Sequence, residues 1–239
     1  YDINKLTIIQ NKKIRLVPVL NKEGLLQKLI DFEKVKTVLP IQAVIMAGGL
    51  GKRLMPLTEK TPKPMLPIAG KPIIEYNIDL LMSYGVTEIS ISVNHLSHVI
   101  EDYFKDGSKK GVHISYIQED QPFGTIGAIR QKKDFKESYV LVMNSDLLTN
   151  IDLDGMFELM MEQQADMVIA TIDYNVQIPY GVIETQENTV MSLREKPTYT
   201  YYSNAGIYIL KREIIHYIPE HSFFNATDLL EKLISENHK

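Results

Sequence analysis

From residue 41 onward, short apolar runs alternate with segments of helical periodicity, and this alternation restricts the fold to few architectures. Residues 41–47 are apolar except for Gln42, which is typical of a strand covered on both faces. Residues 72–84 begin at a proline, carry apolar side chains at helical spacing and end before a glycine, so they predict a helix. Further strands are predicted at 88–93, 112–117, 139–143 and 167–172, with helices at 95–104, 125–133 and 153–164.

This order of elements predicts an α/β fold with a largely parallel sheet, in which ligand sites lie beyond the carboxyl ends of the strands. The pattern becomes less regular after residue 173. Strands are predicted there at 181–184, 190–194 and 206–210, followed by a closing helix at 226–234.

The first 40 residues do not share this alternation. They contain an apolar run at 14–20, a polar turn at 21–24 and a second apolar stretch at 25–30. So short a segment cannot hold a stable core alone. We therefore divide the chain into residues 1–40 and residues 41–239.

Composition excludes several classes of protein. The net charge of -4 and the isoelectric point near 5.9 provide no general attraction for nucleic acid or for an anionic membrane. The absence of cysteine excludes disulfides and thiolate metal sites. Neither a signal-peptide pattern nor an apolar run long enough to cross a bilayer is present, so the expected location is the cytoplasm.

A glycine-rich loop directly follows the first predicted strand and reads Ala47-Gly48-Gly49-Leu50-Gly51-Lys52-Arg53-Leu54. Glycines at this density let backbone N–H groups point into one concavity that can hold phosphate oxygens. The dinucleotide fingerprint fails because Leu54 stands where the third glycine belongs, and the P-loop pattern fails because Arg53 replaces its Ser or Thr. Standing alone, the loop could equally be an ordinary turn.

A second element supports the phosphate reading. Lys63 lies between Pro62 and Pro64, whose fixed φ angles stiffen the backbone that carries the ammonium group. A lysine held in this way is positioned in advance for a ligand phosphate.

Together these stretches resemble the signature of the sugar-1-phosphate nucleotidyltransferase family. The matching runs are Met46-Ala47-Gly48-Gly49-x-Gly51-x-Arg53-Leu54-x-Pro56-Leu57-Thr58, Pro62-Lys63-Pro64-Met65-Leu66-Pro67 and Gly70-Lys71-Pro72-Ile73-Ile74-Glu75-Tyr76. The resemblance implies a Rossmann-like, mostly parallel mixed sheet with helices on both faces, and transfer of a nucleotidyl group from a nucleoside triphosphate to a sugar 1-phosphate. It gives Arg53 and Lys63 catalytic roles on the phosphates. It places Ala47, Gly48, Gly49, Gly51, Gln118, Gly124 and Thr125 at the nucleotide.

The resemblance also implies the metal and the sugar contacts. Asp146 matches an aspartate that binds Mg2+, a cation that prefers oxygen ligands. The family's second metal-binding aspartate has no counterpart before Lys239, so we expect a catalytic domain that lacks its last strand. Asp228 is a weaker substitute and is better explained as a residue that caps the closing helix or faces solvent there. The sugar-phosphate half of the pocket would use Gly181, Glu195, Lys196 and Asn204.

Residues 14–26 resemble the end of a CBS domain, with an extended Val17-Pro18-Val19 strand before a glycine-containing turn. CBS pairs fused to this family imply an adenine nucleotide ligand or a homodimer. They also favour guanylyltransferases acting on mannose, glucosamine or heptose phosphates. Thr125, where thymidylyltransferases often have leucine, argues against dTTP but leaves GTP, CTP and UTP open.

The implied mechanism is in-line attack by a sugar-phosphate oxygen on the α-phosphorus with release of pyrophosphate, stabilised by Arg53, Lys63, Lys196 and Mg2+. The alternatives are a non-catalytic nucleotide- or sugar-sensing subunit and a dinucleotide-dependent oxidoreductase. The retained charged residues disfavour the first, and the missing third glycine disfavours the second. His95 and His98 have a metal-ligand spacing without a third ligand, which indicates a solvated helix face.

Overall fold

The computed structural model describes residues 14–33 and 35–239, and the chain divides into two compact units. The large unit comprises the described residues up to Val168 together with Tyr208–Lys239, and the small unit comprises Ile169–Ile207. No helix among the described residues has both the length and the apolar character needed to span a membrane.

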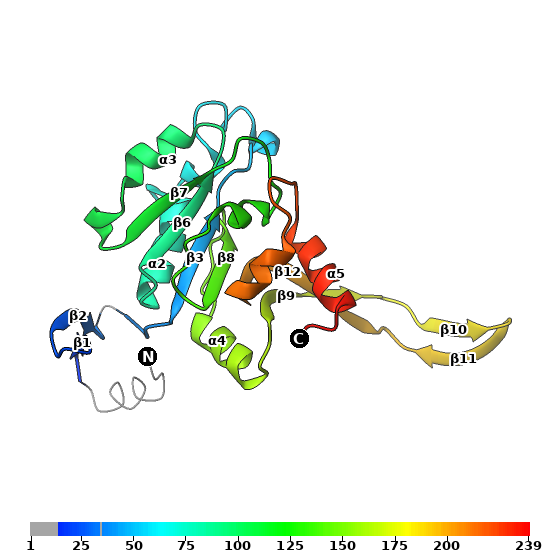
Figure 1. Ribbon diagram of the computed structural model, residues 1–239. Coiled ribbons are helices and arrows are strands. Elements are labelled where there is room, and N and C mark those ends of the chain that lie inside the picture. The colour runs from blue at the N-terminus through cyan, green and yellow to red at the C-terminus, as the bar shows by residue number, and fades with distance from the viewer. Residues whose placement is uncertain (1–13, 34) are drawn as a thin grey trace. The chain divides into compact units, whose positions relative to one another are not determined.

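A six-stranded sheet forms the centre of the fold, with strand order β7-β6-β3-β8-β12-β9 (Figure 1). Strand β3 pairs in parallel with β6 and β8, and β6 pairs in parallel with β7. Every residue of β3 is buried, as its apolar sequence predicts. The strands are β3 (Ile41–Met46), β6 (Glu88–Val93), β7 (His113–Gln118), β8 (Tyr139–Asn144), β9 (Met167–Gln177) and β12 (Thr198–Lys211). The predicted α/β fold with a mostly parallel sheet is confirmed.

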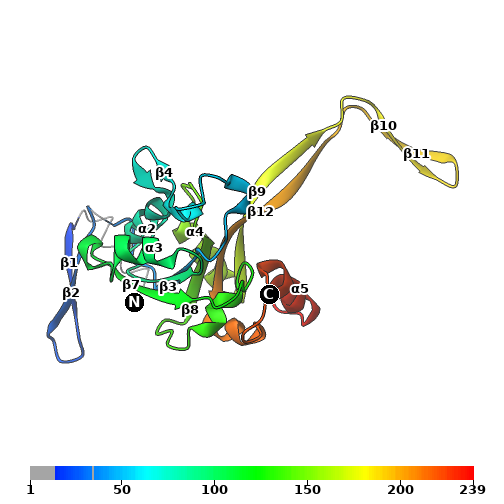
Figure 2. The same ribbon diagram turned by 90° about the horizontal axis from the view of Figure 1, so that it is seen from above.

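Helices connect these strands and bury apolar faces. In α2 the side chains of Ile74, Ile78 and Leu81 are fully buried, which follows from their helical spacing. Tyr103 of α3 donates a hydrogen bond to Glu75 of α2 at 2.7 Å, so these two helices are neighbours (Figure 2). The α-helices are α2 (Ile73–Ser83), α3 (Ser97–Phe104), α4 (Leu153–Glu162) and α5 (Ala226–Ser235). The 3-10 helices are η1 (Lys52–Leu54), η2 (Lys63–Met65), η3 (Ser108–Lys110), η4 (Gly127–Gln131) and η5 (Arg212–Tyr217).

The helix predicted at 125–133 is wrong, because only η4 forms there. The N–H groups of Ile126 and Gly127 both donate to the carbonyl of Phe224, at 3.2 and 3.1 Å. The start of this segment is therefore anchored to a distant part of the chain, and the bonds that follow, from Ile129 to Ile126 and from Lys132 to Ile129, are of the 3-10 type.

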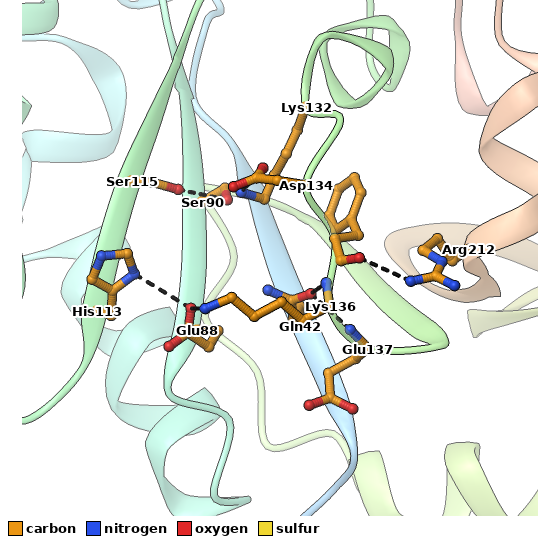
Figure 3. A network of polar contacts seen from close by, with 11 residues as sticks. Gln42, Glu88, Ser90, His113, Ser115, Lys132, Asp134, Lys136, Glu137 and Arg212 are labelled. Carbon is orange, nitrogen blue, oxygen red and sulfur yellow. Dashed lines mark hydrogen bonds and ion pairs between the residues drawn. The ribbon is translucent and has the colours of Figure 1, made fainter.

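A network of polar contacts surrounds the amino-terminal ends of the central strands, opposite the edge where ligand sites are expected (Figure 3). Gln42, the polar exception in β3, is buried and accepts hydrogen bonds from the backbone N–H groups of Lys136 and Glu137. Glu88 contacts His113 and Lys136. Gln42 thus fixes the loop that leads into β8.

The described N-terminal segment is an antiparallel hairpin of β1 (Leu16–Leu20) and β2 (Leu26–Asp31), with a turn where the sequence predicts one. Ile30 and Val38 form a small buried cluster with the partly buried Val17, Val19, Phe32 and Val35. The N–H of Leu39 donates to the carbonyl of Tyr84 at 3.0 Å, which ties the connecting segment to the end of α2. Leu16, Leu20, Leu26 and Leu29 remain exposed. A second short hairpin pairs β4 (Pro67–Ile68) with β5 (Lys71–Pro72).

The small unit consists of strands. It contains the outer parts of β9 and β12 and the antiparallel pair β10 (Val182–Gln186) and β11 (Thr189–Arg194). Strands β9 and β12 are longer than predicted, because the Thr- and Tyr-rich residues 198–204 also favour extended backbone. Most side chains of the small unit are exposed.

Candidate active site

A cavity of about 410 Å³ lies in the large unit at the carboxyl ends of β3, β7 and β8. Parallel strands deliver their following loops to the same edge of a sheet, so residues from distant parts of the chain meet here. The lining residues are Met46, Ala47, Gly48, Gly49, Leu50, Gly51, Lys52, Arg53, Leu54, Lys63, Pro64, Glu119, Gly124, Thr125, Asn144, Ser145 and Asp146. Every predicted nucleotide, catalytic and metal residue except Gln118 is among them.

The glycine-rich loop is held as a backbone cradle. The N–H of Ala47 donates to the hydroxyl of Ser92 at 3.1 Å. Gly51 has a φ of +61°, a conformation that favours glycine, and its carbonyl accepts a hydrogen bond from the buried Thr58 hydroxyl at 2.9 Å. A Cβ on Gly48 would lie 2.2 Å from Oε1 of Glu119. At Gly48 and Gly51, glycine is therefore required by packing or by conformation.

Three cationic side chains line the cavity. Lys52 and Arg53 lie on η1 and are exposed, and neither forms an ion pair within residues 14–33 and 35–239. Lys63 is the first residue of η2 and directly follows Pro62. Its side chain forms an ion pair with Asp146. The cavity therefore combines a backbone cradle with concentrated positive charge, an arrangement suited to a polyphosphate.

Asp146 is positioned by buried contacts on its chain neighbour. The N–H of Ser145 donates to the carbonyl of Met46 at 3.2 Å, and its carbonyl accepts a hydrogen bond from the buried Asn77 amide at 3.0 Å. Sequence reasoning did not single out Asn77, although an amide on the otherwise apolar face of α2 is the signal that could have found it. Asn77 links α2 to the segment that carries the carboxylate.

A divalent metal at this position would find one protein carboxylate. No three His, Asp or Glu side chains converge as a metal-ligand set anywhere in the described part of the chain, and His95 and His98 form no such site. The Asp146 carboxylate beside the cationic cradle suits a cation that takes one carboxylate, water and phosphate oxygens. Asp228 accepts a hydrogen bond from the Asn225 N–H at 2.7 Å in a capping box and thus acts as a helix cap.

Gln118 is the last residue of β7, and the next residue, Glu119, lines the cavity. Gln118 instead donates to Glu101 at 2.6 Å on the exposed surface. Glu119 is buried, and its Oε2 accepts the Phe123 N–H at 3.2 Å, whereas Oε1 makes no hydrogen bond to any residue the structure describes. Burial raises the pKa of the Glu119 carboxyl, although the Phe123 N–H and the nearby Ser92 hydroxyl oppose the shift. This oxygen is therefore a buried acceptor that is open to a donor from a ligand or from water.

The four predicted sugar-phosphate residues belong to the small unit. Gly181 and Glu195 approach each other closely, since a Cβ on Gly181 would lie 3.0 Å from Oε2 of Glu195. Lys196 has a φ of +45°, which is uncommon for a residue with a side chain. Asn204 accepts the N–H of Gly206 through Oδ1 at 2.9 Å. Gly181 and Glu195 are thus brought together, and Lys196 follows them in an unusual backbone conformation.

Comparison with known proteins agrees with this geometry. The profile of the family described as Nucleotidyl transferase matches residues 42–239. The chain belongs to the nucleotidyl transferase family. This match covers the cavity and both units but not the N-terminal hairpin.

The relatives of this nucleotidyl transferase act on sugar phosphates. It is 32% identical over 214 residues to a UTP–glucose-1-phosphate uridylyltransferase of Synechocystis sp., covering 81% of this chain and 55% of the relative. It is 35% identical over 179 residues to D-glycero-alpha-D-manno-heptose 1-phosphate guanylyltransferase of Aneurinibacillus thermoaerophilus, covering 73% of this chain and 76% of the relative. The chain thus spans little more than half of the first relative.

A solved structure shares the fold. The crystal structure of HddC from Yersinia pseudotuberculosis complexed with GMP-PN is 30% identical, has a TM-score of 0.56, and matches over 77% of this chain and 82% of that chain. Members of the family generally use a divalent metal.

Proposed function

We propose that this protein transfers a nucleotidyl group from a nucleoside triphosphate to a sugar 1-phosphate, forming a nucleoside diphosphate sugar and pyrophosphate. The observation that carries this proposal is the cavity in which a glycine cradle, Lys52, Arg53, Lys63 and Asp146 converge. A polyphosphate requires such a concentration of backbone donors and cations, and the relatives with sugar-phosphate activities support the same reaction.

In this reaction an oxygen of the sugar phosphate attacks the α-phosphorus, and the bond from the α-phosphorus to the bridging oxygen breaks as pyrophosphate leaves. The tasks of the protein are to align the two substrates and to stabilise negative charge on the transferred and leaving groups. Arg53 and Lys63 supply fixed positive charge, while the N–H groups of the Gly48–Gly51 loop hold phosphate oxygens. The transfer needs no protein nucleophile.

Asp146 would hold Mg2+ together with water and phosphate oxygens. The metal would neutralise phosphate charge at the reaction centre. The Lys63 ammonium pairs with the Asp146 carboxylate, so one cation and one carboxylate lie side by side at the proposed reaction centre.

We assign the base preference to GTP on the basis of Glu119. A carboxylate only accepts hydrogen bonds, and guanine presents two adjacent donors, N1–H and N2–H, on its Watson–Crick edge. Uracil presents one N–H between two carbonyl oxygens, which a carboxylate would repel. The unpartnered, buried Oε1 of Glu119 therefore favours guanine. The GMP-PN complex of HddC and the heptose 1-phosphate guanylyltransferase relative support this preference.

The sugar half would be supplied by the small unit. Glu195 and Asn204 would form hydrogen bonds with sugar hydroxyls. Lys196 would bind the phosphate of the sugar, and Gly181 would leave room for the sugar beside Glu195. We further propose a role in glycan or cell-surface polysaccharide synthesis in the cytoplasm, without nucleic acid or membrane as partners.

We propose that the N-terminal hairpin belongs to a CBS domain, with an adenine nucleotide ligand and a homodimer as associated properties. The exposed leucines of β1 and β2 support a further surface that covers them. The boundary near residue 40 is part of this proposal.

The test is pyrophosphate release by the full-length protein with four nucleoside triphosphates, each against glucose, mannose, glucosamine and heptose 1-phosphate. One productive combination, lost with EDTA and in Arg53→Ala, would establish the reaction and its substrates. Nucleotide binding without turnover in any combination would contradict catalysis with these sugars and favour a sensing subunit.

Two neighbouring variants test the base assignment. Glu119→Gln should lower kcat/KM for GTP by about 10- to 100-fold and reduce the preference over UTP, because the amide repels one guanine donor. Gln118→Ala should leave this preference intact, since Gln118 contacts Glu101 outside the cavity. The opposite pattern would return base recognition to Gln118.

A further inference from the structure

The segment at the start of α5 packs against the loop that lines the nucleotide cavity, although about a hundred residues separate them in sequence. The N–H of Phe224 donates to the Phe123 carbonyl at 3.0 Å, and the Phe224 carbonyl accepts the N–H groups of Ile126 and Gly127. These three backbone bonds hold the loop on both sides of Gly124 and Thr125, which line the cavity.

A reciprocal pair of side-chain bonds completes the contact. Oδ1 of Asn225 accepts the N–H of Thr125 at 3.3 Å, and Oγ1 of Thr125 accepts the N–H of Ala226 at 2.9 Å. Ala226 is the first residue of α5, so Thr125 satisfies a helix donor that has no partner within the helix. Asn225 in turn satisfies a backbone donor of the cavity loop.

The two segments approach so closely that only glycine fits at position 124 of the loop. Gly124 has a φ of +78°, and a Cβ there would lie 2.5 Å from the Phe224 carbonyl oxygen and 3.0 Å from Oδ1 of Asn225. The same loop contacts Glu119, the residue proposed to bind the base, because the Phe123 N–H donates to its Oε2 at 3.2 Å. A shift at Asn225 would therefore move both Thr125 and the donor that orients Glu119.

We propose that Asn225 is a positioning residue for the nucleotide half of the site, acting through Thr125 and the Phe123–Glu119 contact. This inference rests on the proposed nucleotidyl transfer. Asn225 does not line the cavity, so its effect is confined to how well the loop is ordered for the nucleotide. The sugar-phosphate residues of the small unit have no part in this contact.

The test compares Asn225→Ser with Asn225→Asp in the full-length protein. Serine is a good helix cap but its oxygen lies one bond nearer the backbone, so it caps α5 without reaching Thr125. Asn225→Ser should raise the KM for the nucleotide by about 3- to 10-fold while kcat and the KM for the sugar phosphate stay within about twofold of wild type. Asn225→Asp retains the acceptor and should restore the wild-type KM.

Asp228→Ala is the matched control, because it removes the other half of the capping box without touching Thr125. It should lower the melting temperature and leave the nucleotide KM unchanged. An unchanged nucleotide KM in Asn225→Ser, an equal rise in both KM values, or an equal rise in Asp228→Ala would overturn the inference.

Affinity for a non-hydrolysable GTP analogue, measured by calorimetry in the same variants, keeps this test separate from the proposed reaction. Weaker binding confined to Asn225→Ser supports the positioning role even without turnover. Turnover by the wild-type protein with unaltered affinity in Asn225→Ser would leave the reaction standing and reject the role of Asn225.

Discussion

The large and small units place their candidate site residues in opposite surroundings. In the large unit, buried side chains stand behind the cavity: Asn77 holds Ser145, Thr58 holds Gly51, and Ser92 holds Ala47. In the small unit, Glu195, Lys196 and Asn204 are exposed; Glu195 lies close to Gly181, and Asn204 accepts the N–H of Gly206.

Under the proposed function, this contrast predicts different roles for the two sets of residues. The glycine-rich loop is supported by a close-packed core that tolerates little displacement. The small unit buries few side chains, so its residues depend on local backbone conformation and on the ligand for their final positions. Substitutions in the cradle should thus affect the chemical step, whereas those in the small unit should affect sugar-phosphate binding.

The strongest test of this contrast is Arg53→Ala, which removes cationic charge from the cradle. We expect kcat to fall by about 100- to 1000-fold, the range typical for loss of one group that stabilises transition-state charge. Lys109→Ala removes an exposed charge from η3, outside the cavity, and should leave the rate unchanged. If Arg53→Ala keeps a third of the activity, the cavity is not the reaction centre.

The difference in packing should be visible in stability. Ile78→Ala, at a fully buried position of α2, should lower the free energy of unfolding by about 3 kcal/mol, because it leaves a cavity in the core. Ile183→Ala in β10, where the side chain is 56% exposed, should change it by less than about 0.5 kcal/mol. Urea denaturation measures both. Equal losses would show that the small unit has a core of its own.

Lys196→Ala tests the small unit as the sugar half. The KM for the sugar phosphate should rise by about 10- to 100-fold, as expected for loss of a charge-assisted hydrogen bond, while the KM for the nucleotide stays unchanged. Arg194→Ala removes a neighbouring cation that pairs with Glu184 at 3.3 Å and should alter neither value. A rise in the nucleotide KM alone would remove Lys196 from the sugar half.

The smallest expected effect is at Asp166, in the large unit just before the boundary. Burial alone would raise the pKa of its carboxyl, but hydrogen bonds from Lys211, His238 and the Lys239 N–H outweigh burial and lower the pKa to about 2. The folded pKa lies below the unfolded value of about 3.9, so this contribution is complete above that value and is lost as pH falls towards 2.

Asp166→Asn should accordingly lower the free energy of unfolding by about 1 kcal/mol at pH 7, after allowance for solvent screening, and by progressively less towards pH 2. Urea denaturation at pH 7 and pH 3 measures the difference. Asp134→Asn breaks an exposed ion pair with Lys132, and its effect on the free energy of unfolding should depend less on pH than that of Asp166→Asn. A constant difference at both pH values would assign the loss to packing.

The sequence alone predicted the strands of the central sheet and the α-helices of the large unit, with one helix too many at 125–133. It also predicted the glycine-rich loop, the place of Lys63 between two prolines and the position of Asp146 after β8. These features depend on periodicity and backbone preferences that neighbouring residues carry. The polar Gln42 in β3 was visible as an exception, but its partners at Lys136 and Glu137 were not.

Tertiary structure decided the rest. Gln118 and Glu119 are consecutive, and alternate side chains of extended backbone face opposite ways, so only the packing of β7 shows that Glu119 faces the cavity. Residues 125–133 have a helical pattern, yet only a 3-10 helix forms there, and the Phe224 carbonyl and Asn225 anchor the start of that segment beside the cavity. In the sequence, Asn77 is an unexplained polar residue on an apolar helix face, and only the structure shows that its amide donates to the Ser145 carbonyl. In each case the decisive partner lies far away in sequence, and hydrogen bonds between distant segments have no signature in local periodicity.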